Sequence, residues 1–92
     1  MPTLYPDVVR NLLSLTDRYR RHELNLDEMK TQIWEAARSI SSPDEADLRR
    51  FLQSIEGRFD VARFTVDAVG LDSKIGHLID TLEERLRTTL SS

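Results

Sequence analysis

The chain has 92 residues, of which 39% are apolar and 32% are charged, with no cysteine and a formal net charge of −3. This length fits a single domain with a modest core, and the lack of cysteine excludes disulfides and thiolate zinc sites. No secretory signal is recognisable at the start, and no apolar run reaches the roughly 20 residues that span a bilayer. We expect a cytoplasmic protein outside the membrane, and the acidic balance disfavours nucleic acid as a partner.

The first predicted helix covers residues 6–22. Apolar residues recur at helical spacing on one face, and charged residues occupy the other. The basic end, RYRRH, is typical of cations that stabilise a helix C-terminus. It lacks the interleaved aromatic residues that a single-strand nucleic-acid surface needs.

The second predicted helix covers residues 26–41. Asn25 and Glu28 have the spacing of a capping box, and Leu24 and Met29 that of a hydrophobic staple. Trp34 lies off the apolar stripe of this helix. Two interpretations remain open: the ring covers the edge of the core, or it is an exposed aromatic anchor for a partner.

The third predicted helix, residues 43–69, is the longest. Ser42 to Glu45 reads as an S-x-x-E capping box with Pro43 at the first helical position. At about 27 residues and about 40 Å, this helix would extend beyond the first two. Gly57 is the natural place for a bend, because a glycine inside a helix costs about 1 kcal/mol relative to alanine.

Two apolar stripes run along this third helix. One begins at Leu48 and predicts a core face. The second lies roughly opposite and contains Gly57, Val61, Phe64 and Ala68, whereas an ordinary surface helix is apolar on one side only. Either the last helix folds back over this second stripe, or the stripe is a contact surface.

Gly70 predicts the end of the third helix, and Asp72 or Ser73 the cap of the next. The fourth predicted helix covers residues 72–90, and Glu83 and Arg87 are spaced for an ion pair on it. The four amphipathic segments and their short joints predict an all-α fold, an antiparallel four-helix bundle with a long third helix. The expected core includes Leu12, Leu13, Ile33, Phe51, Leu52, Ile55, Leu78, Leu82 and Leu86.

No pattern typical of catalysis, metal binding or cofactor binding is present. His22 and His77 lack a second ligand at helical spacing, and no glycine-rich loop precedes a helix to hold phosphate. Asp60 and Asp67 share a helix face, as surface acids commonly do. We expect a protein that is not an enzyme.

The layout of a short acidic chain that opens LLSLTDRYRRHELNLDEMKTQIWEAARSI resembles the small helical immunity proteins that bacteria pair with secreted toxins. The colicin D type and those of contact-dependent inhibition systems are similar in this respect. The resemblance implies a non-catalytic inhibitor that binds and neutralises a co-encoded toxin.

Two functions follow as expectations. The first is a partner-binding inhibitor, whose partner is a protein such as a basic toxin domain. The second is a homodimer in which the second stripe of the third helix is buried between two copies, while a DNA-associated regulator is disfavoured by the acidic balance. The residues expected to contact a partner are Val61, Phe64, Ala68, Trp34, Glu56, Asp60 and Asp67.

Overall fold

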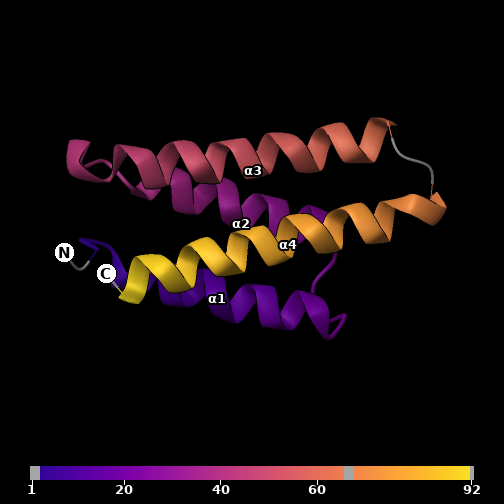
Figure 1. Cartoon of the computed structure of the whole chain (residues 1–92), viewed down its shortest axis with the longest axis horizontal. Coiled ribbons are helices and arrows are strands. Elements are labelled where there is room, and N and C mark those ends of the chain that lie inside the picture. The colour runs from indigo at the N-terminus through magenta and orange to yellow at the C-terminus, as the bar shows by residue number, and fades with distance from the viewer. Residues whose placement is uncertain (1–2, 66–67, 92) are drawn as a thin grey trace.

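The computed structural model describes residues 3–65 and 68–91, and side chains at 65, 68 and 69 lie outside the description. In these ranges the chain forms four α-helices and one short 3-10 turn, with no strand, so the predicted all-α fold is confirmed (Figure 1). The elements are α1 (Pro6–Arg20), α2 (Leu26–Ser39), η1 (Pro43–Glu45), α3 (Ala46–Thr65) and α4 (Ala68–Ser91).

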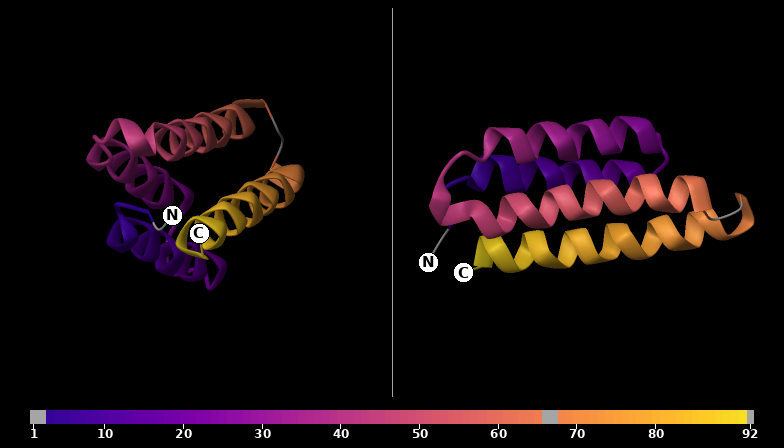
Figure 2. Two further views of the ribbon diagram at one scale, coloured as in Figure 1. Left: turned by 60° about the vertical axis from the view of Figure 1, so that its left-hand side comes forward. Right: turned by 90° about the horizontal axis from the view of Figure 1, so that it is seen from above.

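Each helix packs against its neighbours in the chain, and α1 also packs against α4, which closes the ring of a four-helix bundle (Figure 2). Short joints make successive helices antiparallel. The ends of α1 and α3 therefore lie at one end of the bundle, and the start of α1 and the end of α4 lie at the other (Figure 1). No helix of the described part is long and apolar enough to cross a membrane.

The core is apolar and draws on all four helices. Leu12, Ile33, Leu52, Ile55, Leu78, Leu82 and Leu86 are buried as predicted, whereas Leu13 and Phe51 are half-buried at its edge. Phe59, which has no exposed surface, is the largest of the fully buried side chains. Thr16 is buried among these apolar groups because its hydroxyl donates a hydrogen bond of 2.7 Å to the carbonyl of Leu13.

The predicted capping box of α2 is confirmed. The Asn25 side chain accepts the backbone N–H of Glu28 at 2.8 Å, and the Glu28 carboxylate accepts the backbone N–H of Asn25 at 3.2 Å. Leu24 packs against the core, where Met29 is fully buried. This local motif fixes where α2 begins.

The second predicted capping box, at Ser42 and Glu45, is wrong in its second half. Ser42 does cap, since its hydroxyl accepts the backbone N–H of Asp44 at 3.3 Å. The Glu45 carboxylate instead accepts the Thr3 hydroxyl and the Leu4 backbone N–H, both at 2.8 Å. Glu45 therefore ties the N-terminal segment to the start of α3.

The boundary between α3 and α4 differs from the prediction. Helix α3 ends at Thr65 and passes unbroken through Gly57, and Gly70 lies inside α4 instead of ending a helix. The apolar spacing of Leu71, Ile75 and Ile79 continues the core face of α4 toward its start, which offsets the helix cost of one glycine, about 1 kcal/mol. Helices α1 and α2 each end two residues earlier than predicted, and Val66 and Asp67 lie outside the described residues.

Helix α1 ends in a Schellman motif. The His22 backbone N–H bonds to the Tyr19 carbonyl at 3.0 Å, and that of Glu23 bonds to the Arg18 carbonyl at 2.9 Å. His22 has a φ of 62°, the left-handed conformation in which glycine is the usual residue. These hydrogen bonds determine where the turn lies, and they hold the His22 backbone in a strained conformation.

We predict that His22→Gly stabilises the protein by about 0.5–1 kcal/mol, because relief of left-handed strain exceeds the added entropy of the unfolded chain. Urea denaturation measures the change. His22→Ala, which keeps the strain, is the control and should show no gain. Equal or lower stability of the glycine variant would mean that the histidine ring stabilises this turn.

We also predict that Leu52→Ala lowers the free energy of unfolding by about 2–5 kcal/mol, because it leaves a cavity in the core. The neighbouring exposed substitution Gln53→Ala should change stability by less than about 0.5 kcal/mol. A loss below about 1 kcal/mol at Leu52 would contradict the packing described here.

Candidate functional site

The second stripe of α3 faces solvent. Phe64 is 83% exposed and Val61 is 61% exposed, so α4 does not cover either side chain. The opposite side of the same helix holds Leu52, Ile55 and Phe59, all without exposed surface. Of the two alternatives for this stripe, burial under the last helix is therefore excluded for Val61 and Phe64.

Gly57 lies on the same side of α3, one turn before Val61. A Cβ atom placed on Gly57 would meet no atom within 4 Å, and its φ is not positive. Neither close packing inside this chain nor an unusual backbone conformation explains a glycine here. The missing side chain leaves room for another molecule to approach the helix closely.

Ion pairs join α3 to α2 beside this stripe. Lys30 on α2 pairs with Asp60, and with Glu56 at 3.8 Å; Arg63 pairs with Asp27. The hydrogen bond to Asp60 raises the pKa of Lys30 above its ordinary value, so this lysine is charged at neutral pH. Glu56 and Asp60, two of the acids expected to contact a partner, are thus already balanced in part by bases on the same surface.

Trp34 lies next to these ion pairs and is 47% exposed, so the ring is not sealed into the edge of the core. The Arg38 guanidinium sits over it, 4.6 Å from the ring centre, in a cation–π contact. Trp34, Lys30 and Glu56 help line a shallow depression of about 520 Å³ between α2 and α3. We call the exposed region formed by Trp34, Lys30, Glu56, Asp60, Val61 and Phe64 the α2–α3 surface.

Six of the seven residues expected to contact a partner belong to described helices, but only five can be placed. Trp34, Glu56, Asp60, Val61 and Phe64 lie on the α2–α3 surface. The side chain of Ala68, at the start of α4, and all of Asp67 lie outside the described residues.

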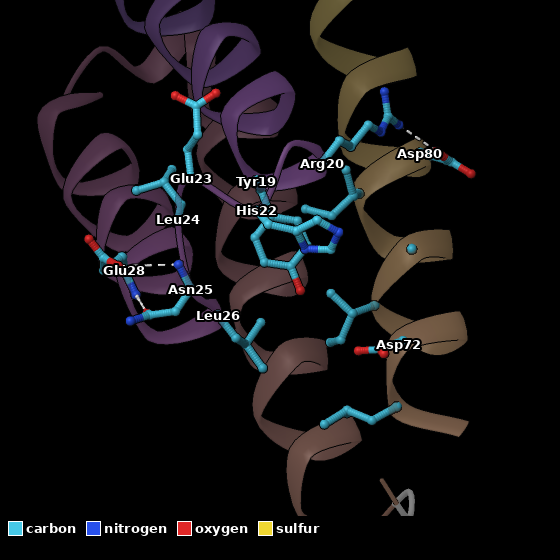
Figure 3. A pocket seen from close by; sticks show the side chains of 14 residues that line it. Tyr19, Arg20, His22, Glu23, Leu24, Asn25, Leu26, Glu28, Asp72 and Asp80 are labelled. Carbon is cyan, nitrogen blue, oxygen red and sulfur yellow. Dashed lines mark hydrogen bonds and ion pairs between the residues drawn. The ribbon is translucent and has the colours of Figure 1, made fainter. Parts of the chain in front are cut away.

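A groove that the sequence did not reveal lies between the α1–α2 joint and the first half of α4 (Figure 3). Its volume is about 750 Å³. The apolar lining comes from Tyr19, Leu24, Leu26, Leu71, Ile75 and Ile79. The only sequence signal for it is the predicted overhang of the third helix beyond the first two. The groove lies instead along α4, which begins at Ala68, earlier than predicted, and has 24 residues against the 20 of α3.

Tyr19 stands in the groove, and Asp72 approaches it from α4 (Figure 3). Partial burial, and secondarily the negative charge of Asp72, raise the pKa of Tyr19 above its ordinary value. The phenol therefore stays neutral at physiological pH and keeps its proton for donation. At the edge of the groove Arg20 pairs with Asp80 and Glu83, which ties α1 to α4.

The basic run at the end of α1 is used within the chain. Arg18 and Arg21 both pair with Glu23, at 4.0 and 3.3 Å, and Arg20 reaches α4. The predicted pair of Glu83 and Arg87 is also present, at 2.6 Å. These arginines are therefore ion-paired and do not form a separate anion-binding patch.

Among the described residues, no three His, Asp or Glu side chains gather closely enough to hold a metal ion. Comparison of the chain with protein-family models, curated proteins and solved structures finds no match. Function therefore has to be inferred from the two surface features above.

We predict that the two tyrosines titrate in separate steps. Hydrogen bonds from Ser41, and from the backbone N–H of Ser42, lower the pKa of Tyr5, whereas burial raises that of Tyr19. Tyrosinate absorbance should show one step below and one above the ordinary pKa of about 10.

Tyr19→Phe should remove the upper step, and Tyr5→Phe the lower one. Asp72→Asn should move the pKa of Tyr19 only part of the way back, because burial is the larger cause of its shift. A single step with the midpoint of free tyrosine would contradict both environments.

Proposed function

We propose that this chain is a non-catalytic protein-binding domain that holds its partner on the α2–α3 surface. The observation that carries the proposal is the 83% exposure of Phe64 on a helix whose other side is fully buried. Burial of a phenylalanine side chain contributes about 1.5–3 kcal/mol of free energy, and an exposed phenylalanine lacks this contribution. A bound protein that covers Phe64 and Val61 recovers that free energy.

The neighbouring residues fit the same use. Trp34 and its stacked Arg38 provide the residue types that are most enriched at binding hot spots. Gly57 leaves the helix backbone accessible, so a partner side chain or helix can approach it closely.

The charges of this surface favour a partner of mixed charge. Asp27, Glu56 and Asp60 face the bases Lys30 and Arg63, and Arg38 adds a third cation nearby. Balanced ion pairs fix the register of a contact and add little long-range attraction. Association at this surface should accordingly depend only weakly on salt.

We propose further that the partner is a bacterial toxin and that the chain is its cytoplasmic immunity protein. The support is the resemblance in layout to helical immunity proteins, together with an exposed aromatic surface on a small acidic bundle. In this role the domain covers the toxin's active site or a surface beside it. No reaction by this chain is required.

The second candidate is a homodimer through the same surface. The observation that favours it is the small residue Gly57 in line with Val61 and Phe64, which lets two α3 helices pack closely across a two-fold axis. Sedimentation of the isolated chain separates the two functions. A stable dimer favours self-association, and a monomer favours a different protein.

We predict that Phe64→Asp leaves the melting temperature within a few degrees of the wild type, because the side chain is exposed. The same change should weaken binding at least about thirtyfold, as expected for a hot-spot aromatic worth about 2 kcal/mol. The binding test is protection of cells that express the toxin encoded beside this chain, or dimer dissociation if the isolated chain dimerises.

Gln53→Asp, at another exposed position of the same helix, is the matched control and should keep full binding. Gly57→Ala tests the glycine separately: it should stabilise α3 by up to about 1 kcal/mol, yet weaken a closely packed contact. A Phe64→Asp protein that folds, keeps its oligomeric state and still protects cells would refute the proposed surface.

A further inference from the structure

A second glycine, Gly76, lines the groove beside Tyr19, and no contact inside the chain requires a glycine at this position. Gly76 lies inside α4 and lines the groove, and a Cβ atom there would meet nothing within 4 Å. Its φ is not positive, so the backbone does not require glycine either. Alanine or any larger residue except proline would stabilise the helix and narrow the groove. This glycine keeps α4 accessible from the groove.

The floor of the groove suits an apolar segment. Leu71, Ile75 and Ile79 follow one another at steps of four along α4; Leu71 is half-buried at the groove, whereas Ile75 and Ile79 are buried in the core beneath it. Leu24 and Leu26, on either side of the α2 cap, contribute the opposite wall. The groove is half-open to solvent and not an enclosed cavity, so a segment of another protein fits it better than a small molecule that must be surrounded.

The charges around the groove are predominantly negative, unlike those of the α2–α3 surface. Among its lining residues in the described part of the chain, four acids stand against one arginine. Arg20 balances Asp80, and Glu23 pairs with other arginines. Glu28 accepts the backbone N–H of Asn25, and Asp72 acts on Tyr19 as a negative charge. Among the described lining acids, Glu28 and Asp72 are the two that no base pairs with, so a segment entering the groove meets these two carboxylates.

We propose that this groove docks a basic amphipathic helix of a partner protein, with apolar residues on its floor and lysines or arginines beside Asp72 and Glu28. This is a second site, separate from the α2–α3 surface. A helix presents apolar anchors at i, i+3, i+4 and i+7, and the half-buried side chains of Leu24, Leu26 and Leu71 are the apolar groups of the groove that such anchors can contact. Tyr19 places a neutral hydroxyl and an aromatic ring where a partner's cation would pass.

The test uses the whole isotope-labelled chain and a synthetic helix of about 18 residues, about five turns, with leucines at the anchor spacing and lysines elsewhere. Amide chemical shifts should change chiefly at residues 19–26 and 71–80. A peptide with glutamate in place of every lysine should bind at least about tenfold more weakly, because it meets charges of its own sign.

Two variants test the two features of the groove. Asp72→Lys should raise the Kd of the lysine peptide about tenfold by reversing the charge, and Gly76→Leu should do so by filling the space. Glu84→Lys is the matched control: it makes the same charge change at an exposed position of α4 outside the groove, and it should leave the Kd within about twofold. Circular dichroism confirms that each variant keeps its helices.

Four results would overturn the proposal. They are no binding of the lysine peptide, shift changes spread over all acidic surfaces, equal loss of affinity in Asp72→Lys and Glu84→Lys, and unchanged affinity in Gly76→Leu. None of these results bears on Phe64, so failure of the groove and failure of the α2–α3 surface are distinguishable.

Discussion

Helices of unequal length share one core in this protein, and the exposed features depend on that mismatch. Helices α1 and α2 have 15 and 14 residues, about 21–23 Å, whereas α3 and α4 have 20 and 24 residues, about 30–36 Å. The end of α1 is tied to the middle of α4, where Arg20 meets Asp80 and Glu83. The first half of α4 therefore extends past α1, and the groove forms where no fifth helix fills the space.

The core and the local caps could be read from the sequence because their causes are local. The spacing of apolar residues placed Leu12, Leu52 and Leu82 inside, and the box of Asn25 and Glu28 involves groups three residues apart. For Val61 and Phe64 the sequence leaves two alternatives, exposure or burial under the last helix. Apolar periodicity shows which residues share a helix face, but it does not show what covers that face. Their exposure depends on which face of α3 packs against the other helices, and that is a tertiary contact.

Other features depend on distant contacts and could not be predicted. Glu45 was placed in a local cap, yet its partners are more than 40 positions earlier in the chain. The local preference of Gly70 favours a helix end, but tertiary burial of the apolar stripe that follows it outweighs this weak preference. The groove depends on how α1 and α4 are positioned relative to each other. The ion pairs of Arg20 with Asp80 and Glu83 mark that position, and they form only in the folded chain.

The hydrogen bonds at the other end of the bundle also determine how the domain can be attached to something else. Tyr5 accepts the backbone N–H groups of Ser41 and Ser42, at 3.2 and 3.0 Å, and Glu45 holds Thr3 and Leu4. Helix α4 finishes beside this anchored segment (Figure 2). A tag, fusion or surface linkage at either end of the described chain thus emerges from one pole, and it leaves the groove at the opposite pole facing outward.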